Sequence, residues 1–377
     1  TGTIKDDGTG DIYKADGTTD TSAVKNDDRV VAVTSPTVNE ASPYAVFTVT
    51  GTAGQTVSLG LTAGTATGGG TDFGSATATT NLQYSIDGGA NWLDYSTTGA
   101  FALPAGGSVL VRTPINNDAT PDNNEAFTLT ATPAGGQAAT GTGTIKDDGT
   151  GDIYKADGTK DTSAVKDDDR ALAVTSPTVN EASPYAVFTV TGVSGQKLTL
   201  ALGNTSTVSD KDAQLGTDTG NAGTGVPLQV YDPSAAAGAG AWVDYTPASL
   251  ATIPSGGVLL VRTRIANDSI LEGAETFTLV ATNTGGTSAE GICTIRDDGQ
   301  GSIYPDNKTG ADDPAAVKDD DREPIAVDDT YTVAEGGTIT GNINANDTDP
   351  DGKTLVGSSV AVVNGSTFTS LTDSAHP

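Results

Sequence analysis

Carboxylate side chains recur at matching places in two halves of the chain, each time in a loop or at the end of an expected strand. In the first half they are Glu40, Asp72, Asp118, Asp122, Glu125, Asp147 and Asp148, and in the second half Glu181, Asp218, Asp268, Glu272, Glu275, Asp297 and Asp298. Calcium is a hard cation that takes about six to eight oxygen ligands, many of them from carboxylates. Any one of these residues alone would fit a solvated acidic loop, but the two matched sets predict calcium sites.

The matching halves belong to a longer repeat. Residues 1–51 return at 142–192 with differences only at Thr19/Lys160, Asn26/Asp167, Val30/Ala171 and Val31/Leu172. A third, looser copy of the opening begins at Thr294. A period of this size indicates a tandem array of domains. We therefore expect residues 1–28 to close a preceding repeat, and the chain to be part of a longer polypeptide.

Composition narrows the class of protein. The 377 residues include 19 Lys and Arg against 48 Asp and Glu, a formal net charge of −29. Nucleic acid is excluded as an expected partner, because phosphate binding depends on Lys and Arg. No apolar run reaches the roughly 20 residues of a membrane-spanning helix, so we expect no membrane insertion within this segment. The one cysteine, Cys293, excludes an internal disulfide, which leaves bound metal to stiffen an extracellular fold.

Short strands broken by Gly, Pro, Asn and Asp run through both halves, a pattern typical of an all-β sandwich. Phe47 and Val49 alternate with Thr48 and Thr50, which gives one apolar and one solvated face. In the first half we expect strands at 32–38, 45–50, 56–61, 82–86, 92–95, 109–115, 126–131 and 140–146. In the second half we expect them at 186–191, 198–202, 228–231, 242–245, 258–265, 276–281 and 291–296. Helical periodicity is absent, so helix content should be very low.

The pattern predicts two complete sandwiches, at residues 29–148 and 170–298. The segments 149–169 and 299–322, which follow them, are rich in Asp, Gly, Thr and Lys. They are either flexible polar linkers or ordered acidic loops, and the carboxylates at both of their ends favour ordered loops.

Residues 323–377 have a different character and predict a partial β domain. Their Asp347–Gly352 stretch begins like an EF-hand loop, but Ser358 stands where that loop needs Glu. We therefore expect an acidic turn there, with or without a calcium ligand, rather than an EF-hand.

Several motifs of the two complete units together resemble the Calx-β domain. They are V-N-E-A-S with A-V-F-T-V-T, G-T-D-F, I-N-N-D with D-N-N-E-A-F-T-L, and the closing G-T-I-K-D-D. The resemblance implies tandem Ig-like sandwiches of the Calx-β type in an elongated array, with the carboxylates named above binding Ca²⁺. Asp122, where Glu is more usual, and Gly149 and Gly299, where a third Asp would stand, imply fewer or weaker sites. Residues 323–377 resemble the cadherin-like repeats of bacterial surface proteins through A-N-D-T-D-P-D-G.

Catalysis finds little support, because the one histidine, His376, leaves both sandwiches without a His-containing catalytic set. The sequence predicts a non-enzymatic extender: the calcium-stiffened part of a giant bacterial adhesin or biofilm matrix protein at the cell surface or outside the cell. Its expected partners are neighbouring repeats of the same chain and, in a filament or matrix, other copies of it.

Two alternatives stay open. A structural subunit of an extracellular filament, sheath or surface layer would make lateral contacts between copies. An accessory module array of an extracellular hydrolase would require a catalytic domain outside these residues.

Overall fold

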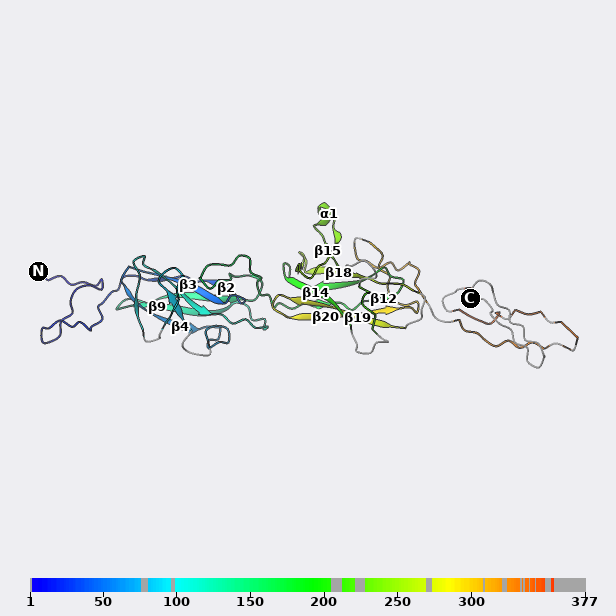
Figure 1. The fold of residues 1–377 in the computed structure, drawn as a ribbon, viewed down its shortest axis with the longest axis horizontal. Coiled ribbons are helices and arrows are strands. Elements are labelled where there is room, and N and C mark those ends of the chain that lie inside the picture. Colours follow the sequence, from blue (N-terminus) through cyan, green and yellow to red (C-terminus); the bar gives the residue numbers. More distant parts are fainter. Residues whose placement is uncertain are drawn as a thin grey trace. The chain divides into compact units, whose positions relative to one another are not determined.

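The computed structural model describes residues 2–75, 81–95, 99–204, 212–220, 228–268, 273–307, 309–320 and 324–332, with short stretches between 334 and 355. The chain forms two compact units. One comprises residues 1–172 with 195–198 and 282–288, and the other comprises 173–194, 199–281 and 289–377. Each unit is built mainly from one β-sandwich (Figure 1).

Two five-stranded sheets make the first sandwich, with the strand orders β1-β3-β8-β5-β6 and β2-β10-β9-β4-β7. The strands are β1 (Ala32–Val33), β2 (Thr37–Asn39), β3 (Tyr44–Thr50), β4 (Thr56–Ala63), β5 (Gln83–Ser85), β6 (Leu93–Asp94), β7 (Phe101–Ala102), β8 (Ser108–Pro114), β9 (Glu125–Pro133) and β10 (Ala139–Lys146).

The second sandwich repeats this topology, with the orders β11-β13-β18-β15-β16 and β12-β20-β19-β14-β17. Its strands are β11 (Ala173–Val174), β12 (Thr178–Asn180), β13 (Tyr185–Thr191), β14 (Lys197–Asn204), β15 (Gln229–Asp232), β16 (Ala241–Asp244), β17 (Ala251–Thr252), β18 (Val258–Arg264), β19 (Glu275–Asn283) and β20 (Ser288–Arg296). Helical structure in the described residues is limited to the single turn α1 (Ala235–Gly238). The predicted all-β sandwich fold is thereby confirmed.

The first predicted strand, 32–38, is wrong as one continuous strand. Strand β1 pairs antiparallel with β3, whereas β2 pairs parallel with β10 in the other sheet. The chain crosses between the sheets at Ser35-Pro36, because proline has no N–H to donate to a ladder and pairing is interrupted there. This crossing places the residues after β2 beside the end of β10.

Aromatic rings fill the space between the sheets. In the first sandwich Phe127 is fully buried, stacks on Phe73 at 4.3 Å between ring centroids and meets the edge of Phe47 at 5.8 Å. In the second sandwich Phe188 and Phe277 form the same edge contact at 5.8 Å. The apolar faces predicted from the alternation of Phe47 and Val49 with threonines therefore form the core.

Residues 149–169 are ordered along the first sandwich. The backbone N–H of Asp152 donates to Thr37 O at 3.0 Å and Asn39 N–H donates to Asp152 O at 2.9 Å, so the segment extends the edge at β2. Ile153 is buried, and the N–H of Tyr154 donates to Ser42 Oγ. The segment thus forms an ordered acidic loop on its own sandwich.

The matching segment that begins at residue 299 makes the same contacts in the second unit. Ser302 N–H donates to Thr178 O at 3.0 Å, and Asn180 N–H donates to Ser302 O at 2.9 Å. Ile303 is buried, and the N–H of Tyr304 donates to Ser183 Oγ.

The described parts of the chain after residue 323 contain one β-bridge, between Ile325 and Thr348. Beside it, the N–H of Val327 donates to Asp347 Oδ1 at 2.7 Å. In the part of the chain with a described structure, no helix has the length and apolarity to cross a membrane.

The matched core rings give a test of whether the two sandwiches fold independently. Phe127→Ala should destabilise the first sandwich by about 3 to 5 kcal/mol, because it removes a buried ring and leaves a cavity. Phe277→Ala should do the same to the second. Hydrogen exchange read by mass spectrometry should show faster exchange in the substituted sandwich only, and a loss of protection in both would contradict independence.

Candidate metal centre

The predicted acidic residues of the first sandwich come from several strand ends and gather at one end of it. Two groups have ligand oxygens that all lie within 4.8 Å of one another: Glu40 with Asp122 and Asp147, and Asp72 with Asp122 and Glu125. Glu40 follows β2, Asp147 follows β10, Glu125 begins β9, and Asp72 and Asp122 lie in the connections before β5 and β9. Asp122 belongs to both groups, so the two candidate cation positions adjoin.

Glu40 is buried, at 5 % exposure. Its Oε1 accepts a hydrogen bond from the backbone N–H of Asp118 at 2.9 Å. Its Oε2 is buried and has no hydrogen-bond partner among the described residues. Asp118 lies outside both groups, and its own Oδ1 accepts from Thr120 N–H at 2.7 Å. Asp118 therefore contributes a backbone N–H that orients Glu40.

The neighbours Asp147 and Asp148 have different surroundings. Asp147 is buried at 2 % exposure within the Glu40 group. Asp148 lies outside both groups: it accepts from Thr150 N–H and Asn123 Nδ2, and it lies 3.6 Å from Lys146 Nζ. Burial alone would raise the pKa of Asp148, but the hydrogen bonds from Thr150 and Asn123 hold it below its ordinary value. The negative charge of Asp148 is therefore balanced by neighbouring protein groups.

The negative charges of the grouped carboxylates are poorly balanced by neighbouring protein groups. Burial, with the nearby charges of Asp118, Asp167 and Asp122, raises the pKa of Glu40 to about 8. Burial, with a hydrogen bond to Asp72, raises the pKa of Glu125 to about 7. Burial is also the first cause of the raised pKa values of Asp122 and Asp147. A proton or a cation is needed to neutralise these groups.

Two acidic residues that are not among the predicted ligands, Asp167 and Asp169, form a third group with Glu40. They lie at the end of the acidic loop 149–169, and burial with the charge of Asp169 raises the pKa of Asp167 to about 6. The available signal was K-D-D-D-R at 166–170, an acidic run placed beside a domain end.

Asn39, which precedes Glu40, holds this third group in place. Its side chain is fully buried, and its Nδ2 donates to Lys146 O, Thr150 O and Asp167 O at 2.9 to 3.1 Å. Its Oδ1 accepts from Asp167 N–H at 2.7 Å. The V-N-E motif therefore combines an organiser of the loop, Asn39, with a candidate ligand, Glu40.

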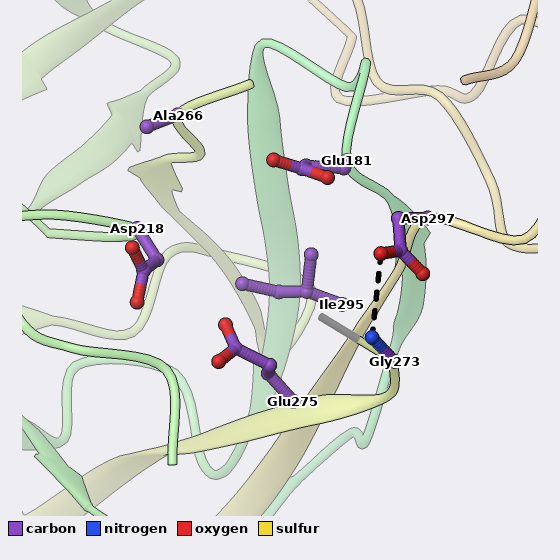
Figure 2. A pocket seen from close by; sticks show the side chains of 7 residues that line it. All are labelled: Glu181, Asp218, Ala266, Gly273, Glu275, Ile295 and Asp297. Carbon is purple, nitrogen blue, oxygen red and sulfur yellow. Dashed lines mark hydrogen bonds between the residues drawn. The ribbon is translucent and has the colours of Figure 1, made fainter. Parts of the chain in front are cut away.

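Carboxylates gather at the corresponding end of the second sandwich. Figure 2 shows Glu181, Asp218, Glu275 and Asp297 around one pocket, where Gly273 N–H donates to Asp297 Oδ2 at 3.3 Å. As in the first sandwich, the Oε1 of the early Glu accepts from a backbone N–H, here from Asp268 N–H to Glu181 at 3.0 Å.

Burial, together with the charges of Asp268, Asp297 and Asp319, raises the pKa of Glu181 to about 7. Asp298 is an ion-pair partner of Arg296, whose Nε donates to Asp298 Oδ1 at 3.0 Å, and it does not line the pocket. Glu272 lies outside the described residues.

The donor set fits calcium. Every candidate ligand in these groups is a carboxylate oxygen, and hard oxygen donors select calcium over zinc or copper. Buried oxygens of Glu40, Asp167 and Asp169 lack hydrogen-bond partners among the described residues, a costly arrangement unless a cation takes their place. In the first sandwich Glu40, Asp72, Asp122, Glu125 and Asp147 would hold such ions. The chemistry supplied would be charge neutralisation and cross-linking of loops.

A family model described as a bacterial Ig domain matches residues 319–376, which cover most of the segment expected to be a partial cadherin-like domain. No curated protein matches the chain. Among solved structures, CBD12 from CALX1.2 is 14 % identical, with 70 % of this chain and 99 % of that chain covered and a TM-score of 0.24.

A tetra-tandem repeat from the extending region of a large adhesion protein is 14 % identical, with 71 % of this chain and 48 % of that chain covered and a TM-score of 0.20. A structure from a 1.5-MDa bacterial ice-binding adhesin is 13 % identical, with 75 % and 70 % covered and a TM-score of 0.24. The structural neighbours of the chain thus include Calx-β domains and adhesin repeats, while the fold assignment rests on the sheets described above.

The raised pKa values predict an unusual pH dependence. Folded Glu40 binds its proton up to about pH 8, whereas an unfolded Glu releases it near pH 4.3. The folded state therefore binds more protons across this window, and stability is lost as pH rises through the folded pKa. Calcium-free chain should melt at a higher temperature at pH 5.5 than at pH 8, and saturating calcium should reverse this order, since ligands must be deprotonated. Melting that rises with pH in calcium-free buffer would contradict the burial of these carboxylates.

Proposed function

We propose that this chain is a non-catalytic, calcium-stabilised extender from a large bacterial surface or matrix protein. The observation that carries the proposal is the gathering of buried carboxylates at the matching end of both sandwiches, around Glu40 and around Glu181. An enzyme has little use for the same acidic cluster in successive units, whereas an array of stiffened modules needs it in every unit. Under this proposal both sets bind Ca²⁺ outside the cell, where the ion is abundant.

The acidic charge supports the extender role. A net charge of −29 favours extended, well-solvated chains when cations are absent. Calcium bound at each sandwich end would neutralise part of that charge where the chain leaves one domain. The assignment to a giant bacterial adhesin or biofilm matrix protein rests on the resemblance of the sequence motifs. The proposed partners are neighbouring repeats, and in a matrix other copies of the chain.

Removal of calcium should destabilise both sandwiches. A ligand that binds only the folded state adds about 2.7 kcal/mol per site at about 100 times its Kd, so a chelator should lower the melting temperature clearly. Glu40→Gln should abolish most of the calcium response of the first sandwich and spare the second, and Glu181→Gln should do the opposite. An unchanged melt of the parent chain in chelator would contradict the calcium proposal.

Calcium should also set the dimensions of the chain. Without it, repulsion between the carboxylates should loosen the ordered acidic loops and let glycine-rich stretches behave as flexible coil. Small-angle scattering should show a stiffer particle with calcium than with chelator at equal protein concentration. A calcium response that appears only as concentration-dependent association would favour the filament alternative, and a profile that ignores calcium would contradict the extender proposal.

A further inference from the structure

We propose that Glu40, Asp167 and Asp169 form a separate divalent-cation site whose purpose is to latch the acidic loop 149–169 onto the first sandwich. The proposal uses the cation of the proposed function, but it concerns two residues that lie outside the Calx-β-like motifs. It makes the loop a calcium-dependent part of its own sandwich.

The geometry joins distant parts of the chain. Glu40 follows β2, while Asp167 and Asp169 lie at the end of the loop, and one oxygen from each of the three falls within 4.8 Å of the others. The three side chains are 5 %, 2 % and 1 % exposed, respectively.

The independent sign of a ligand is the state of their remaining oxygens. Glu40 Oε2, Asp167 Oδ2 and Asp169 Oδ2 are buried and accept no hydrogen bond from any described residue. Buried carboxylate oxygens normally accept several hydrogen bonds or bind metal. An unpartnered oxygen on each of three grouped carboxylates fits a hard cation.

The residue between Asp167 and Asp169, Asp168, does not belong to the cluster. Arg170 Nε donates to Asp168 Oδ1 at 2.8 Å, and Arg170 Nη2 donates to its Oδ2, so this carboxylate is neutralised by an ion pair. Asp168 also forms an antiparallel bridge with Asp148. In an extended chain successive side chains point to opposite faces, so residues 167 and 169 share the face of Glu40 while 168 takes the other.

Backbone hydrogen bonds hold residues 167 and 169 in the orientation that turns their side chains toward Glu40. Asp169 N–H donates to Asp147 O at 2.9 Å, and Gly149 N–H donates to Asp167 O at 2.8 Å. The loop therefore leaves β10 and returns beside it, held by neutral hydrogen bonds but opposed by three carboxylates. A bound cation attracts all three carboxylates and so removes the repulsion between them. Docking of the loop should therefore depend on calcium.

The chain itself supplies a conservative test substitution. Asn26 stands in the first copy where Asp167 stands in the second. Asn keeps an oxygen of the same size and removes one charge, so Asp167→Asn should fold and weaken this site alone. Asp167→Asn with Asp169→Asn should remove it.

The test uses the full chain and calcium, with two readouts. Native mass spectrometry should count one calcium fewer in the double variant than in the parent, and Asp167→Asn should need about tenfold more calcium to fill that position. Lys-C can cleave after the exposed Lys155, Lys160 and Lys166 only when the loop opens. Calcium at about ten times its Kd should slow this cleavage about tenfold in the parent and have little effect on the double variant.

Asp157→Asn is the matched control, because Asp157 lies in the same loop, outside the three grouped carboxylates, and accepts hydrogen bonds from Thr159; it should behave as the parent. A double variant with the parent's calcium count and protection would overturn the latch while leaving the proposed function intact. A parent chain that binds no calcium would overturn both. Unchanged hydrogen exchange in β3 and β8 of each variant shows that the sandwich itself is folded.

Discussion

The cost of burying carboxylates together is the constraint on which the rest of this structure depends. Glu40 and Glu181 lie in nearly closed positions at the ends of their sandwiches, each oriented by a backbone N–H and surrounded by other acids. Burial and repulsion raise the pKa of both. A hydrophobic core alone does not account for such an arrangement, because the same loops could have carried solvated or neutral residues. The arrangement makes sense if a cation is part of the folded state.

The core and the acidic end are linked through the strand crossing near Pro36. The crossing moves β2 into the sheet of β10, which brings Asn39 and Glu40 beside Asp147. The side chain of Asn39 then holds the acidic loop by three hydrogen bonds and donates a fourth to Lys146 O at the end of β10. Two neutral, buried amide atoms thus position the charged groups, while the rings around Phe127 pack between the two sheets. The same organisation returns in the second unit with Asn180.

Much of this could be predicted from the sequence, and the limits have physical causes. Alternation of apolar residues and threonines predicts the long strands, because a half-buried strand has a period of two. Pro36 marks a break within 32–38, but the move of 37–39 into the other sheet depends on pairing with β10, far along the chain. The sequence motif does not distinguish Asp147 from Asp148 as a ligand. Only the fold shows that Lys146, Asn123 and Thr150 balance the charge of Asp148. Asp167 and Asp169 could not be assigned, since their place beside Glu40 depends on hydrogen bonds that span 128 residues.

Calcium should replace protons on the buried carboxylates, and calorimetric titration of calcium into the calcium-free chain measures this exchange. The titration is repeated at pH 7 in buffers of different ionisation enthalpy, so that the dependence of the binding heat on the buffer gives the number of protons released. With the pKa of Glu40 at about 8 and that of Glu181 at about 7, both carboxyls carry protons at pH 7 for much of the time. Calcium binding at pH 7 should therefore be accompanied by proton release, and this release should shrink toward zero at pH 9. Calcium binding with no proton release at pH 7, or no binding at all, would contradict it.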